Sequence, residues 1–168
     1  MADTLISVLE KYSTGIDHVA VAVTNLQKSI EFYQNCLGFK LTERRLVNGE
    51  YSGMDSATME SGNVRFVLVE ATNEKSNVAQ YIKNYGPGVQ HVAISVNNIE
   101  AVVLDLKTRK FEFITDIIKA PGLKQIFSTR DPISGIMIEI IQRTEGQEGF
   151  NDVNVGELFK AMESKGIY

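Results

Sequence analysis

The stretch His18-Val-Ala-Val-Ala-Val-Thr-Asn-Leu26 returns later in the chain as His91-Val-Ala-Ile-Ser-Val-Asn-Asn-Ile99. In both copies the side chains that follow the histidine have the two-residue period of a β-strand with two different faces. Asn25 and Asn98 then stand where a short polar side chain caps the first free backbone amides of a helix. Each copy therefore predicts a strand followed directly by a helix, and the chain contains two related halves.

Each half continues with apolar segments bounded by turn-forming residues, which predict three more strands and the order βαβββ. A short helix over residues 77–85 is expected to connect the halves and to end at Gly86-Pro-Gly88, and a last helix is expected over residues 155–164. The strands expected after the first helix of each half cover residues 39–46, 52–60 and 63–71, and residues 111–118, 123–129 and 136–142.

We therefore expect an α+β fold in which the two βαβββ repeats form one curved mixed sheet with the shape of a bowl. The 168 residues are enough for one buried core, and no low-complexity linker divides them. The expected single domain covers residues 1–168, with repeat one at about 14–72, the connector helix at about 76–86, repeat two at about 88–143 and a helical tail at about 150–166.

Composition and charge exclude several classes of partner. The formal net charge is −4 and the basic residues are scattered among acidic ones, so no basic stripe for nucleic acid is expected. The single cysteine, Cys36, cannot form an internal disulfide, and no apolar run reaches the length of a membrane span. Residues 1–15 carry charges where a signal peptide would be apolar. These features predict a soluble, cytoplasmic protein.

The two histidines of the chain, His18 and His91, occupy equivalent positions in the repeats. A single histidine on an apolar strand is more often a hydrogen-bonded core residue than a metal ligand. Two repeats packed about a pseudo-two-fold axis would nevertheless bring these imidazoles to one point, where they suit a divalent transition metal.

The last strand of each half is the expected neighbour of the first, so it can supply a further ligand. Aligning residues 63–69 with residues 135–141 places Val67 opposite Glu139. Glu139 lies among apolar residues, where a buried carboxylate needs a cation or hydrogen-bond donors; the alternative is a solvent-facing residue on a half-exposed strand. Two histidines, one carboxylate and a valine in the fourth position indicate a facial triad, which leaves positions open for a substrate and O₂.

Further motifs of the chain match a known family. They are Ile16-Asp-His-Val19, Gly88-Val-Gln-His-Val-Ala93, Lys124-Gln-Ile-Phe-Ser128, Ile138-Glu-Ile-Ile-Gln-Arg143 and Gly149-Phe150 followed by Glu157-Leu-Phe-Lys160. With these motifs the chain resembles the vicinal oxygen chelate superfamily, and residues 16–164 are similar to the metal-bearing C-terminal domain of 4-hydroxyphenylpyruvate dioxygenase and hydroxymandelate synthase. The first two motifs are common to the superfamily, whereas the last two are more specific to the dioxygenases.

The resemblance implies a non-haem Fe(II)-dependent dioxygenase that acts on a 2-oxo acid similar to 4-hydroxyphenylpyruvate, by oxidative decarboxylation and hydroxylation with O₂. His18, His91 and Glu139 would hold Fe(II), with Co(II), Mn(II) or Zn(II) as alternatives that affinity alone does not separate. The final helix would close the pocket, and a homodimer is expected. Val69 and Val155 depart from the family, which usually has Asn and Phe there. By resemblance the substrate pocket is lined by Ser56, Gln90, Gln125, Phe127, Phe150 and Asn154.

Several of these pocket residues also have simpler explanations. Gln90 and Gln125 can be polar strand residues that satisfy surface or backbone groups. Phe150 can belong to the core, and Asn154 can cap the last helix.

Two other functions stay open. A metal-dependent isomerase or lyase of the methylmalonyl-CoA epimerase or glyoxalase I type is the first, because Asp17-His-Val-Ala-Val21 and Gly86-Pro-Gly-Val-Gln-His91 also resemble those enzymes. They usually have a fourth ligand, Gln or Glu, at the position of Val67, and Glu70 would replace it only with a shifted register. The second is a non-catalytic small-molecule binding protein that uses the bowl without a metal.

Overall fold

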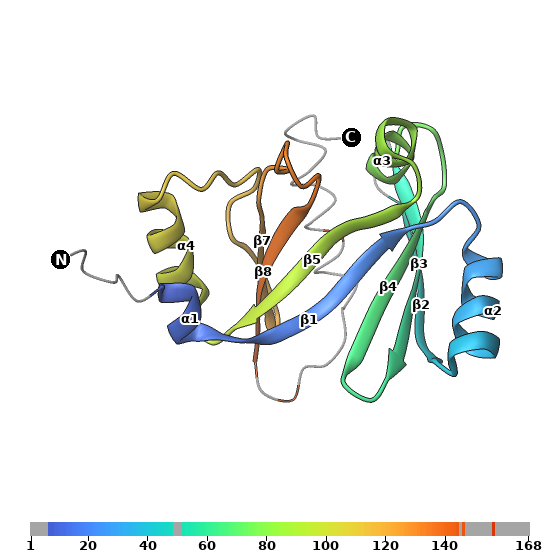
Figure 1. Cartoon of the computed structure of the whole chain (residues 1–168), viewed down its shortest axis with the longest axis horizontal. Coiled ribbons are helices and arrows are strands. Elements are labelled where there is room, and N and C mark those ends of the chain that lie inside the picture. The colour runs from blue at the N-terminus through green and yellow to red at the C-terminus, as the bar shows by residue number, and fades with distance from the viewer. Residues whose placement is uncertain (1–6, 49–51, 145, 147–155, 157–168) are drawn as a thin grey trace.

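Eight strands form one curved sheet that carries helices at both ends, with a further helix at the upper ends of β3 and β4 (Figure 1). This computed structural model describes residues 7–48, 52–144, 146 and 156. The helices are α1 (Val8–Tyr12), α2 (Leu26–Leu37), α3 (Asn77–Tyr85) and α4 (Ile99–Thr108). The strands are β1 (Ser13–Ala22), β2 (Lys40–Asn48), β3 (Gly53–Ser61), β4 (Val64–Ala71), β5 (Gly88–Val96), β6 (Ile118–Ala120), β7 (Leu123–Phe127) and β8 (Met137–Arg143). Their order in the sheet is β2-β3-β4-β1-β5-β8-β7-β6, which confirms the expected α+β bowl.

The two halves meet where β1 pairs with β5 in antiparallel orientation. Val19 lies opposite Val92, its equivalent in the other repeat, so the pseudo-two-fold axis passes between these residues. On either side of the axis His18 lies opposite Ala93 and Ala20 lies opposite His91. We call this β1·β5 pairing the seam. The seam brings the two histidines to the centre of the sheet, as the repeat predicts.

The last strand of each half pairs in parallel with the first strand of the same half. Ala20 lies opposite Val67 in the first half, and its equivalent Ala93 lies opposite Glu139 in the second. The structural registers therefore confirm the alignment that placed Val67 and Glu139 in equivalent positions.

Both main helices begin at the predicted caps. The side chain of Asn25 accepts a hydrogen bond from the Lys28 amide at 2.8 Å, and that of Asn98 accepts one from the Ala101 amide at 3.0 Å. Helix α2 ends at Gly38, whose φ of 72° is left-handed. A glycine adopts this conformation at little cost because it has no Cβ atom. The local sequence thus determines where each helix starts and where α2 stops.

Each half also ties its helix to its last strand. Glu70, just past Val69 on β4, accepts a hydrogen bond from the Leu26 amide at 2.8 Å, and Gln142 on β8 accepts one from the Ile99 amide at the same distance. These contacts satisfy backbone donors that a helix N-terminus leaves free. The N-terminus of each main helix therefore has a second cap, which comes from the last strand of the same half.

Apolar residues from the helices and the sheet form a core in each half. In the first half α2 packs on β3 and β4, and in the second α4 packs on β7 and β8. The largest fully buried side chains of these cores are Leu26, Met59 and Leu68 in the first half and Ile99, Val102, Ile126 and Ile140 in the second. The middle of the sheet remains available for polar side chains.

Three expectations about secondary structure have different outcomes. The connector helix is confirmed as α3. The strand expected at residues 111–118 is wrong, because only Ile118–Ala120 forms a strand and Phe113 makes a single bridge to Ser128. Phe113 instead packs on the core beneath α4, which accounts for its apolar character. Helix α1 was not expected, and the tail helix lies outside the described residues.

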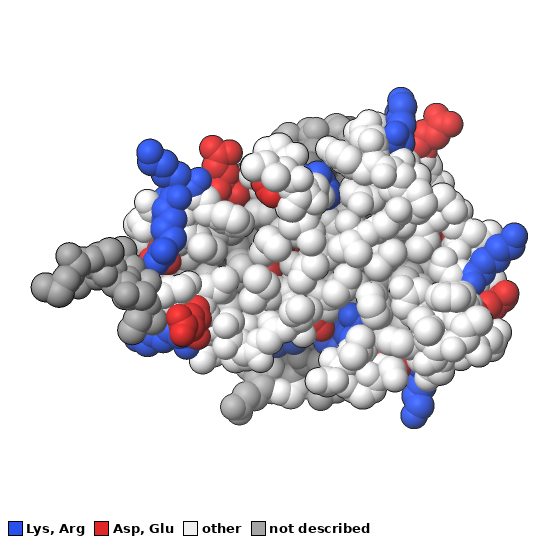
Figure 2. Space-filling view, in the orientation of Figure 1, with Lys and Arg blue, Asp and Glu red and all other residues white. Residues whose placement is uncertain are grey.

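The described part of the chain contains no helix long and apolar enough to cross a membrane. On the face shown in Figure 2, most charged side chains lie toward the edges, and both signs occur there. This face shows no continuous basic surface, which agrees with the interspersed charges of the sequence.

Candidate metal centre and its pocket

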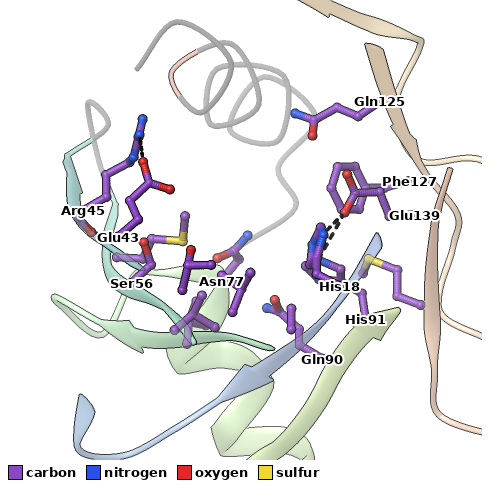
Figure 3. A pocket seen from close by; sticks show the side chains of 17 residues that line it. His18, Glu43, Arg45, Ser56, Asn77, Gln90, His91, Gln125, Phe127 and Glu139 are labelled. Carbon is purple, nitrogen blue, oxygen red and sulfur yellow. Dashed lines mark hydrogen bonds and ion pairs between the residues drawn. The ribbon is translucent and has the colours of Figure 1, made fainter. Parts of the chain in front are cut away.

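Three side chains converge at the centre of the bowl (Figure 3). His18 comes from β1, His91 from β5 and Glu139 from β8. The two Nε2 atoms lie 3.4 Å apart, and each lies 3.3 Å from Oε2 of Glu139. The three potential ligand atoms thus form a nearly equilateral triangle.

This triangle fits a divalent metal ion. Neighbouring ligand atoms about 2.1 Å from an ion lie about 3.0 Å apart in an octahedron and about 3.4 Å apart in a tetrahedron. Glu139 is 1 % exposed, and its Oε1 atom is buried without a hydrogen-bond partner among the described residues. A buried carboxylate oxygen without a partner is costly, and a coordinated cation would remove that cost. These three side chains therefore fit a divalent metal ion as its ligands.

Without an ion, the protonation states of the three groups depend on one another. Burial opposes charge on His18, but the Glu139 carboxylate and the Asp17 carboxylate outweigh it and raise the pKa of His18 to about 9. Burial lowers the pKa of His91. Burial also opposes charge on Glu139, but His18 and His91 prevail and lower its pKa to about 2. One proton on His18, facing an ionised Glu139, is the arrangement that a divalent ion would replace.

A buried ionic cluster orients His18 from behind. Asp17 Oδ1 accepts a hydrogen bond from His18 Nδ1 at 2.8 Å, so Nε2 is left to face the ligand triangle. Arg143 donates to both oxygens of Asp17, at 2.7 and 2.9 Å, and Arg65 lies 3.5 Å from Oδ1. Burial opposes charge on Asp17, but Arg143 and His18 hold the pKa of its carboxyl well below the usual range. Asp17 therefore stays ionised and fixes the orientation of the imidazole.

The fourth position of the pseudo-symmetric site is apolar. Val67 lines the pocket at the place equivalent to Glu139 and has no atom that can coordinate a metal. Glu70 cannot replace it, because its carboxylate caps α2. Among the described residues, the ligand set that comes together is therefore His18, His91 and Glu139.

The ligand triangle opens into a pocket that is lined by side chains from both halves of the sheet. Four of the six predicted substrate residues line it: Ser56, Gln90, Gln125 and Phe127 (Figure 3). The ring of Phe127 stands edge-on to that of His91, with the centroids 5.4 Å apart. Phe150 and Asn154 lie outside the described residues, so their place in the pocket stays a prediction.

Sequence reasoning missed four polar residues of this pocket, of which Thr58 on β3 is one. Arg45 and Glu43 lie on β2, form an ion pair and face the pocket on the side away from the ligand triangle (Figure 3). Asn77, the first residue of α3, also lines the pocket, and its buried Oδ1 has no partner among the described residues. The sequence signal for Arg45 and Glu43 is weak, since charged residues on an edge strand usually face solvent.

Comparisons with known proteins agree with this geometry. Residues 15–140 match the model of the Glyoxalase/Bleomycin resistance protein/Dioxygenase superfamily. The chain belongs to this superfamily. It is 32 % identical over 130 residues to the human mitochondrial methylmalonyl-CoA epimerase, covering 76 % of this chain and 73 % of that protein. It is 28 % identical over 191 residues to the 4-hydroxyphenylpyruvate dioxygenase of Pseudomonas aeruginosa, covering 92 % of this chain and 53 % of the dioxygenase.

Solved structures extend the similarity to the fold. A mutant of 4-hydroxymandelate synthase from Streptomyces coelicolor superimposes with a TM-score of 0.77 at 24 % identity, over 92 % of this chain and 54 % of that one. The chain thus spans about half the length of the dioxygenase and synthase relatives, and most of the length of the human epimerase. Superfamily membership and the fold are established by these matches, and relatives of two reaction types are similarly near.

Proposed function

We propose that the chain is a non-haem Fe(II)-dependent dioxygenase that acts on a 2-oxo acid. The observation that carries this proposal is the ligand set: two histidines and one carboxylate that converge on one point, with Val67 in the fourth pseudo-symmetric position. Such a set leaves several positions on the ion for substrate and O₂. The match to 4-hydroxyphenylpyruvate dioxygenase over 92 % of the chain supports the same class.

The residues of the chain would contribute orientation and exclusion of water. Fe(II), when bound, supplies the one-electron chemistry with O₂ that no side chain provides. Asp17 holds His18 in place, and Phe127 packs against His91. The apolar side chains of the pocket keep water from the reacting groups. They are Ala20, Met54, Val67, Val69, Val78, Phe127 and Met137.

Polar residues of the pocket would position the substrate. Gln90 and Gln125 lie on the side of the ligand triangle, Ser56 lies on the opposite side, and Asn77 lies between them (Figure 3). Gln125 is only 2 % exposed, so its amide can donate to and accept from a ligand in a site with little competing water. We expect these four side chains to affect substrate affinity more than metal affinity.

Anaerobic reconstitution with Fe(II) tests the proposal. The protein is mixed with 4-hydroxyphenylpyruvate and with other aromatic and branched-chain 2-oxo acids, and O₂ uptake and CO₂ release are followed together. We expect coupled uptake and release that are lost in His91→Ala and Glu139→Ala. A protein that binds one equivalent of metal but turns over no 2-oxo acid would overturn the dioxygenase assignment.

A metal-dependent epimerase is the second candidate, and its support is the 32 % identity to methylmalonyl-CoA epimerase. The apolar Val67 argues against it, because such enzymes are expected to have a fourth ligand there. Val67→Glu separates the two candidates: it should abolish O₂ uptake while metal affinity is kept or raised. Val69→Asn, on the same face of β4, is the matched control and should retain uptake. Epimerase activity of the unchanged protein, without O₂ uptake, would select the second candidate.

A further inference from the structure

A groove runs from the metal pocket along α3. Asn77, Gln90 and Met137 line both the groove and the pocket. Gln90 precedes His91 on β5, and Met137 lies opposite His91 across the β5·β8 pairing. The groove and the metal pocket therefore adjoin at these three residues.

Arg130 is the cation of this groove and is held in place by aromatic rings. Its guanidinium carbon lies 4.6 Å from the ring centroid of Tyr81 and 5.1 Å from that of Tyr85. Its Nη1 donates to the carbonyl of Gly135 at 2.5 Å, and the Tyr81 hydroxyl is itself fixed by donation to the carbonyl of Val89 at 2.8 Å. Stacking on two rings orients the guanidinium before any ligand arrives.

The charge of Arg130 is not neutralised by the described lining of the groove. That lining contains no aspartate or glutamate, and Arg130 makes no ion pair within 4 Å in the part of the chain that the structure describes. The adjacent Asp131 is occupied by the turn that follows, since it accepts from the amide and hydroxyl of Ser134 at 2.8 and 2.5 Å. A cation with free donors thus faces a groove that adjoins the pocket of the ligand triangle.

We propose that this groove binds a second acidic group of the substrate, a carboxylate or a phosphate, and that Arg130 recognises it. The inference rests on the proposed use of a 2-oxo acid and narrows its class: the oxo-acid end lies at the metal, and the second acidic group lies at Arg130. A planar guanidinium forms paired hydrogen bonds with such a group. Arg130 is accordingly a specificity-determining residue of this enzyme.

Binding of matched acids tests the proposal. Calorimetry on the Zn(II)-loaded protein compares 2-oxoglutarate, 2-oxoadipate and 2-oxopimelate with straight-chain 2-oxo monocarboxylates of the same lengths. At the best length we expect the dicarboxylate to bind at least about tenfold more tightly, because the second group adds charge-assisted hydrogen bonds. The same chains ending in a phosphonate distinguish a phosphate from a carboxylate as the natural group.

Variants then assign the preference to the residue. Arg130→Met should reduce the preference to about twofold or less, and Arg130→Lys should restore part of it. Tyr85→Leu removes one stacking face at a residue that is 61 % exposed, and should weaken the preference without unfolding the protein. Arg109→Met removes an arginine paired with Asp105 on α4, outside the groove, and is the control.

The outcomes separate this inference from the proposed function. Equal binding of both acid series to the unchanged protein, or a preference that survives in Arg130→Met, would overturn the inference even if 2-oxo monocarboxylates support O₂ uptake. A preference that depends on Arg130 in a protein with no O₂ uptake would support the anion site and reject the dioxygenase.

Discussion

Metal binding should release about one proton for each ion bound near neutral pH. In the metal-free site His18 is protonated, because its pKa is raised to about 9, while the pKa of Glu139 is lowered to about 2 and that of His91 is lowered. Near pH 7, two units below that value, about 99 % of His18 carries the proton that coordination must displace. The apparent metal affinity should therefore rise about tenfold per pH unit and level off above about pH 9.

Calorimetric titration with Zn(II) in buffers of different ionisation enthalpy measures this release directly. Asp17→Asn is the informative variant, because it removes a carboxylate that raises the pKa of His18, and the plateau should then begin at lower pH. Release of no proton, or of two, near pH 7 would refute the reasoning, since it would mean that the three groups do not share a single proton.

Variants of Asp17 and of the helix caps, together with the pH dependence of stability, test other contacts of the fold. Asp17→Asn should also weaken metal binding by about 10- to 100-fold, measured by chelator competition, because the ligand His18 loses its charged partner; a change below twofold would contradict this. Glu70→Ala and Gln142→Ala should each lower the free energy of unfolding in urea by about 1 kcal/mol, since each removes an equivalent helix cap. Metal affinity should not change in either variant. A loss of stability in only one of the two variants would contradict the equivalence of the caps. The metal-free protein should lose stability as pH rises from about 6.5 through 9, because the raised pKa of His18 stabilises the fold only while the imidazole is protonated. It should also lose stability as pH falls through the lowered pKa of Glu139, near 2. Thermal unfolding across pH measures both limits, and a melting temperature that is flat between pH 6.5 and 9 would argue against the His18–Glu139 pair.

The fold and the ligand triangle could be predicted because the information for them is periodic. The repeat places His18 and His91 in equivalent positions, and the two-residue period of strands fixes which side chains share a face. Aligning the last strands then places Glu139 against Val67, and the registers of the sheet bear this out. Where the repeat is exact, symmetry replaces the long-range information that a single sequence normally lacks.

Other features depend on contacts that no local pattern contains. Phe111 and Phe113 alternate with polar residues as a strand would, yet their rings pack on each other and Phe113 packs beneath α4, because a helix face satisfies apolar residues as well as a sheet does. Arg45 and Arg130 are of a residue type that usually lies at the surface, and only the folded chain shows that they line the pocket and the groove.

The seam gives the ion a mechanical role besides its chemical one. His18 belongs to one half of the sheet, whereas His91 and Glu139 belong to the other, so coordination would latch the two halves together across β1 and β5. Any fluctuation that parts these strands must release the ion, and at a free metal concentration of 100 times Kd this adds about 2.7 kcal/mol to the cost of opening. Amide hydrogens along the seam should therefore exchange about a hundredfold more slowly in the loaded protein, while those that open by local fraying of α2 should exchange at the same rate in both forms. Occupancy of the centre could then be measured from backbone amides, without any reaction.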